Sequence, residues 1–251
     1  MFPLPFSLLP LSIPINSGVF KEFLDDLIKD GFASRNDDET DGGAPQLFSI
    51  TPKQQQLTMN FDLVDDTSML VHYEFLGRVL GKAVYESILV EPQFCLPFLN
   101  QLMGKLNTLE DLKNYDDEYY NNLNKLRHYK EEEIDNLGLA FELTVGGTTP
   151  NSAPRTVDLV RSGRNIAVTK KNVFQYTQAV ANELLNVLGA HQTRAFLRGF
   201  RDLIPVSWVR LFSAKELQKL ISGDDSVRGI DVPSLKRATQ YLGGYHESQP
   251  Y

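Results

Sequence analysis

Cys95 is the only cysteine among 251 residues, so it is the first side chain to consider for covalent chemistry. A nucleophilic thiolate needs an electropositive and partly exposed setting that lowers the pKa of the thiol. Cys95 instead lies within FCLPFL (94–99), between aromatic and aliphatic side chains and with no basic residue close in sequence. Because free cysteine is among the most frequently buried residue types, this setting favours a packing role, and a catalytic role is the alternative.

The other residue types that carry chemistry form no recognisable active site. Four histidines are spread along the chain without metal-ligand spacing, and each is interpreted as a surface residue or a satisfied core residue: His72, His128, His191 and His246. The motifs GxSxG, HExxH and GxGxxG and the Walker loop are absent from the sequence. The sequence therefore predicts no metal and no cofactor.

Composition excludes several further function classes. The net charge of -7 and the pI of about 5.2 argue against a general nucleic-acid binder, which usually carries a basic face. A single cysteine excludes an intramolecular disulfide and a cysteine-rich zinc site, and it fits a reducing compartment. We therefore expect a cytoplasmic protein, with the nucleus as the alternative location. No apolar run approaches the roughly 20 residues that span a bilayer, so no membrane partner is expected.

The first 17 residues differ from the rest of the chain. They are apolar and uncharged, but they lack the basic n-region of a signal peptide. Prolines interrupt every helix that could form there, at Pro3, Pro5, Pro10 and Pro14. We interpret residues 1–17 as an atypical leader that does not belong to the domain that follows.

The elements that must position any site are mostly helical. The clearest helical period covers residues 68–90, where one face carries Leu76, Val79, Leu80, Ala83 and Val84. Gly77 and Gly81 stack on one side of the same segment. Each glycine costs helix stability of roughly 1 kcal/mol, so we expect another backbone to pack closely against that side.

Further helices are predicted on either side of a short β insert. The predicted helical segments are 19–29, 92–104, 108–136, 172–188, 192–204, 213–223 and 231–245, and capping boxes are expected at Thr108 with Asp111 and at Ser213 with Glu216. Residues 139–145 alternate like a half-buried strand. TVDLV (156–160) and NIAVT (165–169) are predicted to be two more strands, joined by a turn at SGR (162–164). The sum is a mostly helical α+β chain with a β insert in the middle.

Four segments in collinear order resemble the N-lobe of a HECT-type E3 ubiquitin-protein ligase. They are GVFKEFL (18–24), YEFLGRVLGKAVYESILVEPQF (73–94), LFSAKELQKLISG (211–223) and IDVPSLKRATQYLGGY (230–245), with FLRGF (196–200) between the second and third. The segment GRVLGKAVYE (77–86) is most similar to the branch of the family that carries IQ motifs. The resemblance covers about residues 18–251, and it implies an α+β N-lobe with an inserted α/β subdomain, at about residues 92–178, that binds an E2 enzyme.

The resemblance implies a two-step transfer of ubiquitin. HECT ligases accept ubiquitin from an E2 as a thioester on a cysteine in a separate C-lobe, and then pass it to a substrate lysine. This chain is expected to stop before that C-lobe, and Cys95 matches neither the position nor the context of the family's acceptor. No catalytic residue is therefore assigned, and the chain is not expected to be active alone. Protein substrates are expected to bind through regions outside it.

The resemblance also implies an E2-binding groove in this chain. The implied groove residues lie on an acidic helix, at the entry to the first strand of the insert and at the start of the following helix: Tyr119, Leu123, Leu126, Asp135, Asn136, Leu137, Leu139 and Phe174. A small apolar anchor patch with a polar rim is typical of such docking sites. The alternative is that the same stripe is core. The chain departs from the family pattern at Gln178, where an aromatic is frequent, and at Gly138, where a larger side chain is usual.

A second ubiquitin contact is implied near Phe98 and Leu99, although relatives that bind ubiquitin there carry an aromatic where this chain has Leu99. Two other functions remain open at this point. The chain could be a non-catalytic module that binds E2 or ubiquitin and competes with a full ligase. It could also be a truncated and inactive product.

Overall fold

The computed structural model describes residues 18–32, 46–52, 55–91, 93–147 and 153–223, together with Arg237. The predicted leader (1–17) and, apart from Arg237, the predicted helix at 231–245 lie outside these ranges. Helices dominate the described residues, with two small antiparallel sheets, β1–β2 and β3–β4. The α+β fold class expected from the sequence is therefore confirmed. No helix among the described residues is long and apolar enough to cross a membrane.

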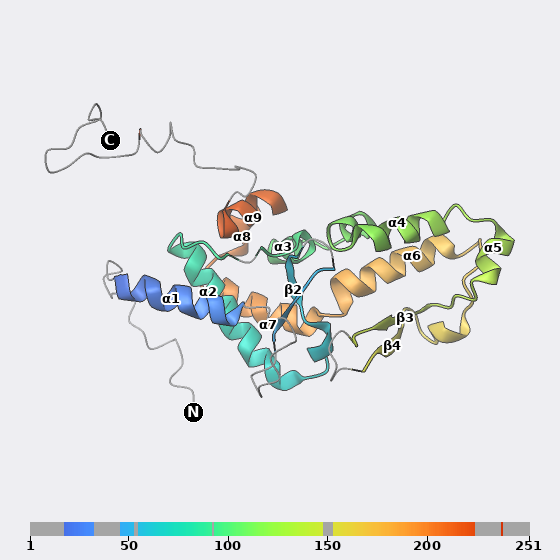
Figure 1. The fold of residues 1–251 in the computed structure, drawn as a ribbon, viewed down its shortest axis with the longest axis horizontal. Helices are drawn as coiled ribbons and strands as arrows, with labels where there is room; N and C mark the ends of the chain where they lie inside the picture. Colours follow the sequence, from blue (N-terminus) through green and yellow to red (C-terminus); the bar gives the residue numbers. More distant parts are fainter. Residues whose placement is uncertain are drawn as a thin grey trace, which may run out of the picture.

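The elements follow one another along the chain in this order: α1 (Gly18–Gly31), β1 (Phe48–Ile50), β2 (Leu57–Met59), η2 (Phe61–Leu63), η3 (Thr67–Met69), α2 (Leu70–Tyr85), α3 (Leu96–Leu102), η4 (Leu109–Asn114), α4 (Asp117–Leu126), α5 (Glu131–Asn136), β3 (Glu142–Val145), β4 (Arg155–Asp158), η5 (Gly163–Asn165), α6 (Val173–Asn182), the π-helical turn η6 (Glu183–Val187), α7 (Ala190–Arg201), α8 (Val206–Val209) and α9 (Ala214–Ser222). In Figure 1 the molecule is elongated, with α1 and α2 towards one end and α4, α5, β3 and β4 towards the other.

The described residues form two hydrophobic cores. The first core surrounds the crossing of α2 and α7 and takes in α1, α3, α9 and the β1–β2 pair. The second core draws its buried residues from 109–188, which include η4, α4, β3 and α6. Phe61 and Tyr115 pack against both cores, and their stacked rings lie 6.3 Å apart between centroids. We call the residues around the second core, 109–188, the small subdomain.

The two long helices of the first core approach each other through glycines. A Cβ atom on Gly77 would overlap the carbonyl oxygen of Phe196 in α7, and one on Gly199 would overlap the carbonyl oxygen of Glu74 in α2. A Cβ on Gly81 would lie 3.1 Å from the carbonyl oxygen of Phe200. The predicted close packing at the glycine side of this helix is confirmed, and α7 is the backbone that packs there.

The predicted capping boxes are present, at Thr108 with Asp111 and at Ser213 with Glu216. Thr108 begins a 3-10 helix, η4, and a separate α-helix, α4, starts after Asp116. The predicted helix at 92–104 is shorter in the structure and corresponds to α3. The predicted helix at 172–188 corresponds to α6 followed by a π-helical turn, and Gly189 separates that turn from α7.

Of the two further strands predicted for the β insert, the first forms as β4, and the prediction of a second strand at 165–169 is wrong. β4 pairs antiparallel with β3, with Leu143 opposite Val157. Residues 165–169 contribute one isolated bridge, between Ala140 and Ala167, and residues 163–165 form the 3-10 turn η5. The reason is a contact across the sequence: the Phe141 N–H donates to the carbonyls of Gly163 and Ile166, which ties this segment to the start of β3.

Candidate functional site

Cys95 lies at the N-terminus of α3 and is 1% exposed. Its burial among apolar side chains raises the pKa of the thiol to about 11, because burial disfavours the charged thiolate. A neutral and inaccessible thiol is a poor nucleophile at physiological pH. The packing role favoured by the sequence is confirmed.

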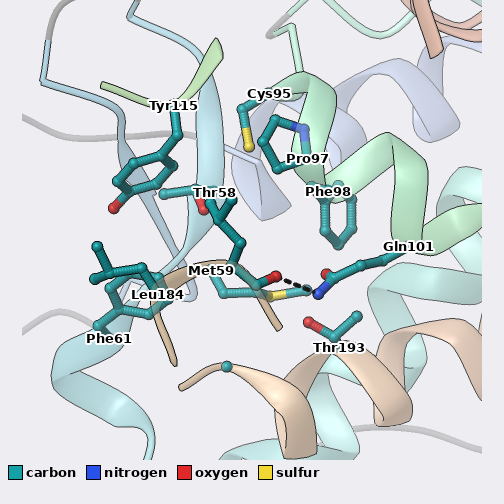
Figure 2. A pocket seen from close by; sticks show the side chains of 12 residues that line it. Thr58, Met59, Phe61, Cys95, Pro97, Phe98, Gln101, Tyr115, Leu184 and Thr193 are labelled. Atoms are coloured by element: carbon teal, nitrogen blue, oxygen red, sulfur yellow. Dashed lines mark hydrogen bonds between the residues drawn. The ribbon is translucent and has the colours of Figure 1, made fainter. Parts of the chain in front are cut away.

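A cavity beside Cys95 lies at the junction of the two cores. Figure 2 shows Cys95 and Phe98 on one side of this cavity, Tyr115 and Leu184 on the other, and Thr58 between them. The Gln101 side-chain amide crosses from α3 and donates to the carbonyl of Leu185 at 2.7 Å. The space inside is about 20 Å³, which is room for about one water molecule. This cavity is too small for a cofactor or a peptide substrate.

Within the described ranges, no three His, Cys, Asp or Glu residues come together as a metal site. The candidate residues that remain to be placed are those that the family resemblance implies for a groove.

The structure divides those groove residues into two groups. One group is exposed: Phe174 at the start of α6 is 54% exposed and Leu137 after α5 is 48% exposed, with Asp135 and Asn136 exposed beside Leu137. Large apolar side chains usually gain free energy by leaving water. Two such side chains in solvent on one subdomain are suitable anchors for a partner.

The other group belongs to the second core. Leu123 and Leu126 are only 5% and 6% exposed, while Tyr119 and Leu139 are half-buried and pack against that core. The expectation that Leu123 and Leu126 are exposed anchors is therefore corrected, and for them the alternative interpretation as core residues holds. Burial raises the pKa of Tyr119 to about 12, so its hydroxyl stays protonated.

Local sequence explains why Leu137 points into solvent. Ile134 is fully buried and fixes α5 on the second core, and the Glu133 carboxylate accepts from the Lys130 N–H at the start of that helix. Gly138 follows with a φ of +60°, and a Cβ there would meet no atom within 4 Å. The left-handed backbone, and not a lack of space, accounts for glycine where the family usually has a larger residue.

Two residues of this region were missed by the sequence analysis. The Arg127 guanidinium lies 4.7 Å from the centroid of the Phe174 ring. The Lys170 ammonium donates to the carbonyls of Arg127 at 2.9 Å and Tyr129 at 2.7 Å, which joins the end of α4 to the approach of α6. The sequence contained one signal for Lys170. A lysine just before a helix N-terminus interacts unfavourably with the helix dipole, so its ammonium is expected to bind an acceptor in another element.

Phe98 and Leu99, the residues implied for a second ubiquitin contact, lie in the first core. Phe98 is 3% exposed and Leu99 is fully buried. Phe98 packs against Phe48, Phe94 and Phe196. A partner cannot contact these two side chains in this structure, so Phe98 and Leu99 form no ubiquitin-binding surface in it.

Comparison with known proteins decides the family. Residues 42–251 match the family described as HECT-domain (ubiquitin-transferase), which is most of the chain. The chain belongs to the HECT family. The match agrees with the mostly helical α+β architecture and with the collinear segments found in the sequence, and the chain corresponds to the N-lobe part of a HECT domain.

Three curated ubiquitin-protein ligases are at least 35% identical to the chain over the aligned residues. It is 35% identical to Ubiquitin-protein ligase E3B of Homo sapiens over 238 residues, which cover 92% of the chain and 21% of that protein. It is 35% identical to E3 ubiquitin-protein ligase HUL5 of Saccharomyces cerevisiae over 234 residues, 92% of the chain and 24% of the relative. It is 40% identical to E3 ubiquitin-protein ligase UPL6 of Arabidopsis thaliana over 178 residues, 70% of the chain and 17% of the relative. The chain therefore spans about a fifth of the length of these relatives.

Proposed function

We propose that this chain carries the E2-docking surface of a HECT-type E3 ubiquitin transferase. The observation that carries the proposal is the pair of exposed apolar side chains, Leu137 and Phe174, on the small subdomain. Binding energy at protein interfaces is concentrated in a few such anchors with a polar surround. Asp135 and Asn136 supply polar groups next to Leu137.

The remaining groove residues support these anchors from within the subdomain. Leu123 and Leu126 bury their side chains in the second core, which also holds α6 through Val173 and Tyr176. Tyr119 and Leu139 are half-buried at the margin of that core. A docking surface whose supporting residues are already packed needs little ordering when the partner arrives, and this favours affinity.

In this proposal, ubiquitin reaches the substrate in two acyl transfers. An acceptor thiolate attacks the E2 thioester, the E2 thiolate leaves, and a new thioester forms. A substrate lysine amine then attacks that thioester, the acceptor thiolate leaves, the amine loses a proton, and an isopeptide bond forms. Cys95 does not serve as the acceptor, because its thiol is buried and its pKa is raised. The contribution of the small subdomain is to bind the E2 that is loaded with ubiquitin.

Replacing the Phe174 anchor tests the proposal. Phe174→Ala should weaken binding to a cognate E2 by at least about tenfold, because an exposed aromatic anchor is lost. Trp208→Ala is the matched control, since Trp208 is also an aromatic with about half its surface exposed (55%) but lies on α8, outside the small subdomain. Affinities can be measured by titration calorimetry with a panel of E2 enzymes. Equal binding by wild type and Phe174→Ala would remove this surface from the docking site.

A further inference from the structure

Arg127 lies directly beside the exposed anchor of the proposed docking surface. Its guanidinium carbon is 4.7 Å from the centroid of the Phe174 ring, within the range of a cation–π contact. Arg127 follows the last residue of α4, and Phe174 is the second residue of α6. The contact therefore joins two helices of the small subdomain at the surface, where Phe174 remains 54% exposed.

The position of Arg127 is fixed at both ends. Its backbone carbonyl accepts from the Lys170 ammonium at 2.9 Å, and the neighbouring Tyr129 carbonyl accepts from the same ammonium at 2.7 Å. Its guanidinium is held by the Phe174 ring. A charged group that is already oriented loses less conformational freedom when it binds a partner.

Arg127 has no ionic partner within the described ranges. Seven ion pairs join described residues, and none of them includes Arg127. Three glutamates follow closely in sequence at the start of α5, and one of them, Glu133, accepts from the Lys130 N–H instead. The guanidinium thus keeps its N–H donors for a group outside this part of the chain.

The chemistry of arginine limits what that group can be. A guanidinium on an aromatic ring uses its positive charge and its face in the cation–π contact, and it keeps five N–H donors at its edge. A carboxylate matches that edge with two parallel hydrogen bonds, and such charge-assisted pairs are stronger than neutral ones. A partner that covers Phe174 with an apolar side chain also excludes water from the pair, which strengthens it.

We propose that Arg127 is a specificity-determining residue of the docking surface: it selects E2 enzymes that carry a carboxylate beside the apolar side chain that contacts Leu137 and Phe174. This inference rests on the proposed function, because it names the chemistry of the E2 that the same surface takes. E2 enzymes with a neutral or basic residue at that place bind more weakly, since they leave the guanidinium without its acceptor.

The test uses the full chain and an E2 that has Asp or Glu next to its apolar contact residue, together with the carboxylate-to-amide variant of that E2. Arg127→Gln should lower the affinity for the acidic E2 by about tenfold, because a hydrogen-bonded charge pair is lost. It should not change the affinity for the amide variant. Arg201→Gln is the control, since Arg201 is an exposed arginine at the end of α7 and makes no ion pair among the described residues.

Reversing the charge of Arg127 tests the inference most sharply. Arg127→Glu should bind the acidic E2 more weakly than Arg127→Gln does. An E2 with lysine in place of its carboxylate should restore to Arg127→Glu at least about half of the affinity that the substitution removed. The advantage of wild type over Arg127→Gln should shrink at about 0.5 M salt, where charges are screened. Equal affinity of wild type and Arg127→Gln for the acidic E2, with Phe174→Ala still impaired, would overturn this inference and leave the docking proposal standing. No binding of wild type to any E2 would overturn both.

Discussion

At the scale of single residues, the sole cysteine and the exposed anchors have opposite environments. Cys95 is the residue that composition makes most conspicuous, and the fold removes it from solvent. Phe174 and Leu137 carry no reactive group, and the fold leaves about half of each side chain in water. In our proposal, the chain serves ubiquitin transfer through residues of the second kind, which contact the E2.

The environment of Cys95 predicts how it reacts. Its pKa of about 11 and its 1% exposure make native Cys95 resistant to alkylation near neutral pH, whereas the unfolded chain is labelled readily. The raised pKa also means that the thiol favours the folded state below the pKa of the unfolded thiol and that this contribution is lost as pH rises towards 11. Iodoacetamide labelling followed by mass spectrometry measures the rate.

A fast labelling of the native protein at pH 7.5 would contradict the burial of Cys95. A ubiquitin adduct on Cys95 that disappears on reduction, after incubation with E1, E2, ubiquitin and ATP, would contradict its role as a packing residue.

At the scale of elements, the contact between α2 and α7 depends on backbone approach. Gly77→Ala should destabilise the protein by about 2–3 kcal/mol, because its Cβ would overlap the Phe196 carbonyl in α7 and the helices must move apart. Gly81→Ala should cost less than about 1 kcal/mol, since its nearest contact is 3.1 Å and alanine favours the helix. Urea unfolding followed by circular dichroism measures both. A smaller cost for Gly77→Ala than for Gly81→Ala would mean that the helices do not cross at Gly77.

The Lys170 bridge holds α4 and α6 together at the surface. Lys170→Met should reduce E2 affinity about threefold and increase amide exchange in residues 127–130, because two carbonyls lose their donor and Arg127 is less well oriented. Lys171→Met is the matched control, as an exposed lysine next in sequence. Hydrogen exchange and calorimetry report the two effects. Unchanged exchange in Lys170→Met would show that the bridge does not order this turn.

The sequence predicted the elements whose cause is local. Helical period and glycine spacing predicted α2 and its close partner, and Ser213 with Glu216 predicted the start of α9. Contacts between segments apart in the sequence were missed: β4 pairs with β3, and the Phe141 N–H donates to the carbonyls of Gly163 and Ile166. The contact of Arg127 with Phe174 also depends on how α4 and α6 pack, and no local pattern encodes it. The groove set came from family resemblance, and burial then separated its core residues from its exposed ones.

At the scale of the whole molecule, the two hydrophobic cores stabilise different parts of the fold. The first core builds the crossing of α2 and α7, and the small subdomain extends from it with α4, α5 and the start of α6 towards one end (Figure 1). The HECT family match runs from residue 42 to residue 251 and includes residues of both cores. In our account, the extended end receives the E2, and its specificity is set where Arg127 meets Phe174.

Locating the bound E2 tests whether the small subdomain is the docking surface. A photo-reactive amino acid can replace Phe174 in one sample and Trp208 in another, and each can be irradiated with a ubiquitin-loaded E2. We expect a cross-linked product with the E2 from position 174, mapped by mass spectrometry to an apolar loop of the E2, and none from position 208. Cross-linking from position 208 alone would mean that the E2 docks outside the small subdomain.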